Sequence, residues 1–230
     1  MRLVLFDIDG TLLWSDGTGR AAMEGALVEV FGTSGSPEYR YDGKTDRQIV
    51  RELMREHGHH DSHIDDRIEE LLGLYVERLE RELEEGGRRP VLCAGVMETL
   101  SALEARPDVT LGLLTGNLER GAALKLAAVG IDIARFRANA FGSDEEHRPL
   151  LPAVAQRRAR DLLGLDVRGD RIVIIGDTPA DIACGRGIGA RAVAVATGRY
   201  SVEDLAAHDP AALFPDLRDT DAVVHAILTV

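Results

Sequence analysis

The sequence has few of the features that mark secreted, membrane or fibrous proteins. Only two cysteines, Cys93 and Cys184, occur in 230 residues, so we expect no structural disulfide and predict a cytoplasmic protein. The first apolar run ends at Phe6, which makes it too short for a signal peptide or a membrane-spanning helix. No internal repeat and no low-complexity tract is present.

The chain also has fewer basic residues than acidic ones. The chain has 27 Lys and Arg residues against 39 Asp and Glu residues, a net charge of −12 at pH 7. Such a chain is a poor match for nucleic acid or an anionic membrane, and we expect neither as a partner. With 45% hydrophobic and 29% charged residues, the composition is that of an ordinary globular protein. Nothing in the sequence indicates the oligomeric state.

Hydrophobic periodicity divides the chain into strands and helices. Short apolar runs of the kind found in buried parallel strands occur at 3–6, 109–114, 171–175 and 190–196. Apolar residues at helical spacing predict helices at 22–31, 45–58, 62–83, 96–105, 119–130, 149–163, after Pro179 and at 219–228. The order of the strands in the sheet does not follow from these patterns.

The two element types are unevenly distributed along the chain. From residue 90 onward, helices and strands alternate, which implies a parallel sheet with helices on both faces. The stretch 14–89 shows helical patterns and no strand pattern. We therefore predict an α/β fold, with a Rossmann-like core formed by residues 1–14 and 90–230. A helical cap domain, residues 15–89, is expected to be inserted after the first strand.

Polar side chains follow three of the four predicted strands. They are, in chain order, Asp7 and Asp9, then Thr115 and Asn117, then Asp177 with Asp181 four residues further on. Ligands of open parallel sheets bind beyond the carboxyl ends of the strands, so we expect one crevice to unite these residues. The carboxylates are hard oxygen ligands suited to Mg²⁺. Helix caps and turns are the commoner explanation for a single strand end, whereas three such ends together favour a site.

Four short motifs stand in a fixed order along the chain. They are Asp7-Ile8-Asp9-Gly10-Thr11, Leu113-Leu114-Thr115-Gly116-Asn117, Arg148-Pro149 and Ile175-Gly176-Asp177-Thr178-Pro179-Ala180-Asp181. Together they resemble the motifs of the haloacid dehalogenase superfamily of hydrolases, and the resemblance covers nearly the whole chain. The helical insert resembles the cap of the phosphoglycolate phosphatase and β-phosphoglucomutase branch. The third motif departs from the usual pattern, in which Lys rather than Arg precedes the Pro.

The resemblance implies roles for the acidic residues. Asp7 is expected to be the nucleophile that forms an aspartyl-phosphate, and Asp9 the general acid and then the base that activates water. Mg²⁺ is expected on Asp7, Asp177 and the main-chain carbonyl of Asp9. Asp181 is expected to bind either a metal-bound water or the side chain of Arg148.

The resemblance also implies which residues bind the phosphate. Thr115 is expected to offer its hydroxyl, with Gly116 and Asn117 shaping the loop around the phosphate. Arg148 is expected to supply a forked pair of donors to the phosphate oxygens. Gly10 allows the chain to turn tightly beside the phosphate.

The implied function is Mg²⁺-dependent hydrolysis of a small phosphorylated metabolite. A phosphomutase of the same branch is the main alternative. A 2-haloacid dehalogenase is disfavoured, because those enzymes lack an acid at the position of Asp9. A phosphate-sensing protein without activity is disfavoured by the intact set of catalytic groups. The sequence does not identify the metabolite.

The loop before the second predicted helix contains Gly43-Lys44-Thr45. It is not a P-loop, because the position that requires a Gly is occupied by Glu38 and no strand precedes it. Two interpretations remain. Either Lys44 and Thr45 contact the substrate and select it, or Thr45 or Asp46 simply caps the helix.

Overall fold

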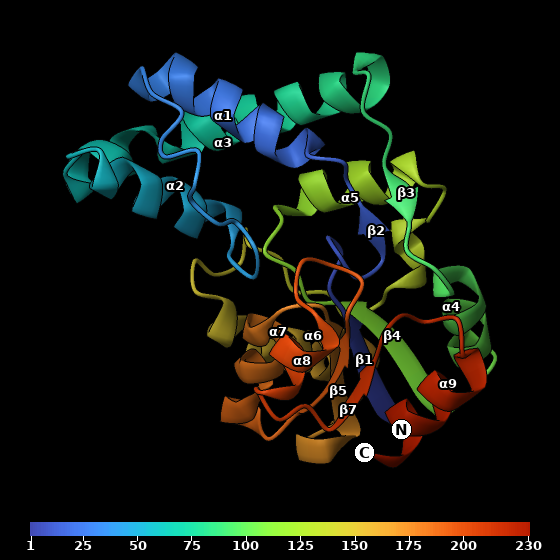
Figure 1. Ribbon diagram of the computed structural model, residues 1–230. Coiled ribbons are helices and arrows are strands. Elements are labelled where there is room, and N and C mark those ends of the chain that lie inside the picture. Colours follow the sequence, from blue (N-terminus) through green and yellow to red (C-terminus); the bar gives the residue numbers. More distant parts are fainter.

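The computed structural model describes residues 1–230 and contains a five-stranded sheet covered by helices, with a helical unit at one end (Figure 1). All neighbouring strands of this sheet are parallel, in the order β4-β1-β5-β6-β7. Its strands are β1 Arg2–Phe6, β4 Val109–Leu113, β5 Ile172–Gly176, β6 Arg191–Val195 and β7 Ala212–Phe214. Their carboxyl ends therefore lie along one edge of the sheet.

Nine α-helices and four short 3₁₀ turns account for most of the remaining chain. The helices are α1 Thr18–Phe31, α2 Asp46–Glu56, α3 Asp61–Glu85, α4 Val96–Glu104, α5 Glu119–Ala128, α6 Leu151–Leu163, α7 Pro179–Cys184, α8 Val202–Ala206 and α9 Thr220–Thr229. The 3₁₀ turns are η1 Ile133–Arg135, η2 Arg148–Leu150, η3 Gly169–Arg171 and η4 Gly185–Ile188. None of the helices combines the length and the apolar character needed to cross a membrane.

Strand β1 shows why helices cover both faces of the sheet. Side chains alternate between the two faces of a strand. Leu3 and Leu5 pack in one cluster with side chains of α6, whereas Val4 and Phe6 pack in another with side chains of α4, α5 and α9. All four side chains are fully buried, and each burial contributes on the order of 2 kcal/mol. The predicted α/β fold is confirmed.

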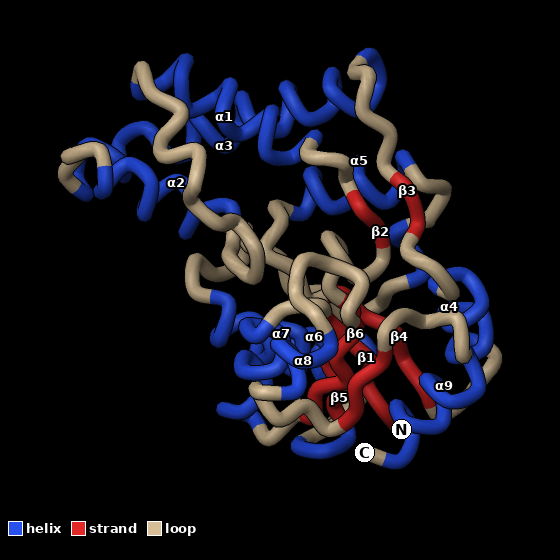
Figure 2. Tube along the Cα trace, in the orientation of Figure 1, coloured by secondary structure: helices blue, strands red, loops and turns tan.

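The chain leaves the sheet through β2 (Leu13–Trp14) and returns through β3 (Val91–Leu92), two antiparallel strands that pair with each other (Figure 2). Between them, α1, α2 and α3 bury a separate hydrophobic cluster that includes Met23, Leu53 and Tyr75. We call the α1–α3 unit the cap and the rest of the chain the core. In Figure 1 the cap lies beyond the end of the sheet, with α5 of the core beneath it.

Three short features differ from the sequence prediction. The prediction that the stretch 14–89 contains no strand is wrong at its first residue, because Trp14 belongs to β2 and pairs with Val91. Strand β7 and helix α8 were also not predicted by the sequence patterns. Strands of two or three residues offer too few positions to show alternation, and α8 is only five residues long.

Candidate active site

A cavity of about 380 Å³ lies between the cap and the carboxyl ends of the core strands. Its walls include Asp7 after β1, Thr115 after β4 and Asp177 after β5. Arg20 and Tyr41 are among the cap residues that line the other side. The expected convergence of three strand ends in one crevice is therefore confirmed.

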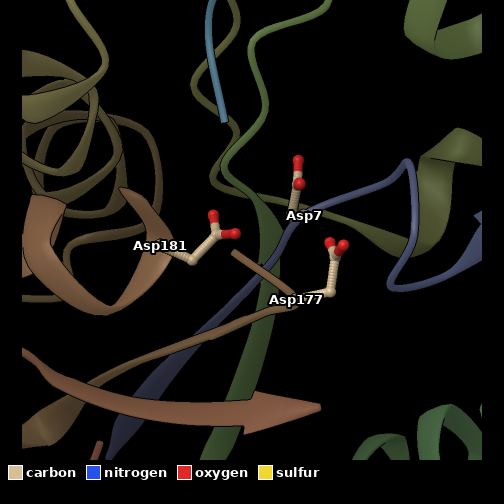
Figure 3. A group of neighbouring side chains, drawn as sticks. All are labelled: Asp7, Asp177 and Asp181. Atoms are coloured by element: carbon tan, nitrogen blue, oxygen red, sulfur yellow. The ribbon is translucent and has the colours of Figure 1, made fainter. Parts of the chain in front are cut away.

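Three buried carboxylates lie close together, and two of them, Asp7 and Asp177, line this cavity. One oxygen each of Asp7, Asp177 and Asp181 lies within 4.8 Å of the others (Figure 3). Asp7 and Asp177 follow the neighbouring strands β1 and β5, and Asp181 lies on α7. A guanidinium nitrogen of Arg148 is 3.2 Å from Asp7 Oδ1 and also forms an ion pair with Asp181. Three negative charges thus meet one positive charge away from solvent.

Burial, together with this excess of negative charge, raises the pKa values of two of the carboxylates. Burial raises the pKa of Asp7 to about 6, although Arg148 acts in the opposite direction. Burial, followed by the charges of Asp181 and Asp7, raises the pKa of Asp177 well above its usual range. A divalent cation offsets such repulsion, and carboxylate oxygens are the ligands that hard cations prefer. The cluster is therefore suited in charge and donor type to a divalent metal ion.

Asp181 uses both of its oxygens for contacts within the protein. Oδ2 accepts hydrogen bonds from the main-chain N–H and the hydroxyl of Thr178, at 3.0 and 2.6 Å. Thr178 in turn caps α7 by accepting the N–H of Asp181, which completes a capping box. The other oxygen, Oδ1, accepts from Arg148. This arrangement suits Asp181 to holding Arg148 in place more than to binding a metal ion.

Arg148 has donors that the protein leaves unused. Its side chain is 4% exposed, and its Nε has no hydrogen-bond partner. Arg148 also lines the cavity, and its hydrogen bonds within the protein all use Nη2, so Nη1 is the nitrogen left to donate to a ligand. A guanidinium beside a buried carboxylate has the charge and the forked donors that suit a phosphoryl oxygen.

Two glycines allow the main chain to pass very close to Asp177. A Cβ atom at Gly198 would lie 1.8 Å from Asp177 Oδ2, and one at Gly10 would lie 2.3 Å from it. Gly10 also has a φ of 81°, a conformation that favours glycine. The Thr11 hydroxyl donates to Asp177 Oδ1 at 3.1 Å. These contacts fix the carboxylate of Asp177 in one position.

Asp9 is held by a second group of polar side chains, Asn117 and Lys125. Its Oδ2 accepts hydrogen bonds from Asn117 Nδ2 at 2.8 Å and from Lys125 Nζ at 2.7 Å. Burial alone would raise the pKa of Asp9. The charge of Lys125 and the hydrogen bonds from Lys125 and Asn117 outweigh burial, so the pKa lies below its ordinary value.

Lys125 is the residue of this group that the sequence motifs do not reveal. The buried residues of α5 are Gly121, Ala122, Lys125 and Leu126, a spacing that places them on one face of the helix. A lysine on the buried face of a helix that directly follows the motif Thr115-Gly116-Asn117 is the signal that could have identified it.

The loop Thr115–Asn117, which lies between β4 and α5 of the core, contacts the cap. The Thr115 hydroxyl oxygen accepts a hydrogen bond from Asn117 Nδ2 at 2.8 Å, so its own proton can be donated to a ligand. The carbonyl of Gly116 accepts the main-chain N–H of Asp46, on the cap, at 2.9 Å. A Cβ atom at Gly116 would lie 1.9 Å from the carbonyl oxygen of Lys44. Close docking of the cap therefore requires a glycine here.

The two candidate specificity residues of the cap loop lie in different places. Lys44 lines the cavity, and its Nζ donates to Glu52 Oε2 at 2.6 Å and to the Tyr39 hydroxyl at 2.7 Å. Thr45 is fully buried and is not part of the cavity wall. Its hydroxyl donates to the carbonyl of Glu146 at 2.6 Å and accepts a main-chain N–H of α2 at 3.1 Å. The helix-cap interpretation is confirmed for Thr45, and a substrate contact by Lys44 stays a prediction.

The chain is similar to known proteins over most of its length. Residues 4–186 match the model of the haloacid dehalogenase-like hydrolase family. A phosphoglycolate phosphatase of Pseudomonas savastanoi pv. phaseolicola (strain 1448A / Race 6) is 26% identical over 219 residues, which are 94% of this chain and 77% of that protein.

Solved structures share the fold. A hydrolase from Pseudomonas syringae superposes with a TM-score of 0.74 at 21% identity, covering 98% of each chain. CbbY from Rhodobacter sphaeroides, in complex with phosphate, superposes with a TM-score of 0.72 at 18% identity, covering 95% of this chain and 96% of that chain. Because the family match spans well over half of the chain and the motifs meet in one cavity, this protein belongs to the haloacid dehalogenase-like hydrolase family.

Proposed function

We propose that this protein is a Mg²⁺-dependent phosphatase that hydrolyses a small phosphorylated metabolite through an aspartyl-phosphate on Asp7. The observation that carries the proposal is the position of Asp7. Its buried carboxylate lies beside the guanidinium of Arg148 and lines the same cavity as Arg148 and Thr115. A phosphoryl group bound by these donors would meet a carboxylate nucleophile. Family membership and the similarity to a phosphoglycolate phosphatase support this function.

The reaction has two steps. In the first, a carboxylate oxygen of Asp7 attacks phosphorus, and the ester oxygen leaves with a proton from Asp9. Asp9 must first take up that proton, because Lys125 and Asn117 favour its ionised form. In the second, Asp9 takes a proton from water, the water oxygen bonds to phosphorus, and the bond from phosphorus to Asp7 breaks. Phosphate and the free carboxylate of Asp7 result. Arg148 and Thr115 stabilise the charge on the phosphoryl oxygens in both steps.

The residues proposed to hold Mg²⁺ are Asp7 and Asp177, with the main-chain carbonyl of Asp9. Asp7 and Asp177 belong to the buried cluster that carries excess negative charge. When bound, the cation neutralises charge on the phosphate so that an anionic nucleophile can approach it.

The cavity indicates the size of the substrate. A volume of about 380 Å³ accommodates a small metabolite. Phosphoglycolate is the first ester to test, because a relative carries the name phosphoglycolate phosphatase. We place the enzyme in the cytoplasm, with no nucleic-acid partner, in keeping with its acidic composition.

The deciding experiment is a panel of phosphorylated metabolites, including phosphoglycolate, assayed for released phosphate with and without Mg²⁺. Release should require Mg²⁺ and should stop with EDTA. Rapid acid quenching of a reaction with ³²P-labelled substrate should leave label on the protein. Asp7→Asn should fold normally and take up no label.

The same panel separates a phosphatase from a phosphomutase. A mutase would convert a sugar phosphate into its isomer and release little phosphate. Activity that survives in Asp7→Asn, or full activity in EDTA, would refute the proposal. A protein that binds phosphate without releasing it from any ester would be a sensor instead.

A further inference from the structure

Lysine is rare in this chain, and both of its lysines lie at the same cavity. Only Lys44 and Lys125 occur among the 27 basic residues, and both line the cavity. Lys44 lies in the cap, whereas Lys125 lies on core helix α5 with its side chain only 5% exposed. Lysine is almost never buried to this extent unless it is paired. The contacts of Lys125 therefore indicate what it does.

Lys125 reaches back along its helix to the loop that precedes it. It follows Asn117 by eight residues, about two helical turns, and long side chains on a helix point toward its N-terminus. Its Nζ donates to Asp9 Oδ2 at 2.7 Å and to Asn117 Oδ1 at 2.6 Å. Asn117 Nδ2 donates to the same Asp9 oxygen at 2.8 Å. The three side chains thus form a closed triangle of hydrogen bonds.

The triangle determines how the carboxylate of Asp9 is oriented. Neither donor uses Oδ1, so Oδ1 is the oxygen placed to exchange a proton with a reacting group, with Ser15 as a further hydrogen-bonding neighbour of the carboxylate. With a single donor, the carboxylate could rotate about that hydrogen bond. Because the charge of Lys125 is already matched by Asp9, Lys125 is poorly suited to bind the substrate anion directly.

The cap closes the remaining side of Lys125. A Cβ atom at Gly19, on cap helix α1, would lie 3.2 Å from Nζ and 3.4 Å from Cε of Lys125. The positive charge also acts on the buried carboxylate of Asp46, at the start of cap helix α2. Lys125 therefore lies between the proton-transfer residue of the core and the two cap helices, shielded from water.

We propose that Lys125 is a positioning residue that holds Asp9 for its reaction with water. The inference rests on the proposed phosphatase function. In the step concerned, Asp9 Oδ1 removes a proton from water as the water oxygen bonds to phosphorus. The bond from phosphorus to the Asp7 oxygen breaks, and its electron pair returns to Asp7 as a carboxylate. Lys125 itself exchanges no proton.

The test is a pre-steady-state assay of Lys125→Met with p-nitrophenyl phosphate. The p-nitrophenolate group leaves without needing a proton, so Asp7 should still become phosphorylated. Hydrolysis of the phosphoenzyme needs Asp9 in place, and misplacement by about 1 Å can cost on the order of 100-fold. We expect a burst of about one equivalent of p-nitrophenol, then turnover slowed by about 30-fold or more, with KM within about 3-fold of wild type.

Two comparisons distinguish positioning from general damage. Asp9→Asn should show the same burst, and adding Lys125→Met to it should slow turnover by less than about 3-fold, because nothing is left to position. Arg120→Met, a matched control, removes another cation of α5, one that pairs with Glu80 at the surface, and should show no slow phase after a burst.

A second variant and three possible results complete the test of Lys125. If Lys125→Met unfolds, Lys125→Gln, which keeps one donor, serves in the same assay and should show the burst with a smaller loss of turnover. Unchanged turnover, loss of the burst together with turnover, or equal losses in the wild-type and Asp9→Asn backgrounds would overturn the inference. A wild-type protein inactive on every phosphate ester would instead refute the proposed function itself.

Discussion

The carboxylate of Asp46, on the cap, accepts a hydrogen bond from the main-chain N–H of Leu118, on the core, at 2.8 Å. Leu118 precedes the first turn of α5, so the bond satisfies a free donor at the positive end of that helix. Asp46 also donates its own N–H to the carbonyl of Gly116 at 2.9 Å. Two hydrogen bonds from one cap residue thus fasten the cap to the ends of the loop that carries Asn117. Docking of the cap and ordering of the loop Thr115–Asn117 are therefore physically linked.

Replacing Asp46 by Asn should remove a pH-dependent cost to stability. Burial raises the pKa of Asp46 to about 6, although Lys125 acts in the opposite direction. The folded state therefore binds the proton more tightly than the unfolded state does. The preference of the folded state for protonated Asp46 stabilises the protein below pH 4, and this stabilisation is lost as the pH rises through 6. Above that pH, the buried charge of Asp46 lowers the free energy of unfolding. A shift of two units corresponds to about 3 kcal/mol.

Urea unfolding at several pH values measures this effect. The stability of Asp46→Asn relative to wild type should increase by about 3 kcal/mol between pH 4 and pH 7. The Asn side chain can still accept the hydrogen bond from Leu118, so the effect reports the charge. Asp66→Asn, at an exposed position of α3, is the matched control and should show no such slope. Parallel curves for wild type and Asp46→Asn would contradict the prediction.

Gly116→Ala should prevent the cap from docking while leaving the core folded. A Cβ atom at this position would lie 1.9 Å from the carbonyl oxygen of Lys44, a main-chain atom that cannot rotate away. We expect kcat/KM for a phosphate ester to fall by about 10-fold or more, since closure excludes water and orients the substrate. Gly73→Ala, whose Cβ would meet nothing within 4 Å, is the control and should keep wild-type kinetics. An unchanged kcat/KM in Gly116→Ala would show that docking does not limit catalysis.

The core of the site could be predicted because its residues directly follow strands. A parallel sheet brings the carboxyl ends of its strands to one edge, so Asp7, Thr115 and Asp177 were expected at the same edge, and the observed order β4-β1-β5 makes their strands neighbours. Arg148 followed from the resemblance to a family. Its pairing with Asp181 depended on the helical turn of α7, which Pro179 at the first position makes easy to predict.

The contacts between cap and core could not be predicted in the same way. Lys125 and Asp46 lie on helices separated by many residues, and their roles depend on how the cap docks on the core. Strand order likewise depends on packing between elements, so periodicity left it open. The pairing of β2 with β3 was missed because two residues per strand carry no periodic signal.

Mg²⁺ should stabilise the protein even without substrate. The buried carboxylates of Asp7, Asp177 and Asp181 meet one positive charge, that of Arg148. A divalent cation relieves this repulsion, so millimolar Mg²⁺ should raise Tm by several degrees relative to EDTA. Asp177→Asn should abolish most of the Mg²⁺-dependent increase. An equal increase in wild type and Asp177→Asn would place the ion elsewhere.

Arg148 should be needed both for the stability of the buried carboxylates and for catalysis. Two substitutions distinguish the effect of its positive charge from that of its planar guanidinium. Arg148→Met leaves three buried carboxylates without a cation and should lower the free energy of unfolding by about 3–5 kcal/mol in EDTA. It should also lower kcat/KM by about 100-fold or more, because the donors to the phosphoryl group are lost. Arg148→Lys keeps the charge but loses the fork, so it should recover most of the stability and only part of the activity. If Arg148→Lys is as unstable as Arg148→Met, the planar guanidinium and not its charge holds Asp7 and Asp181 together.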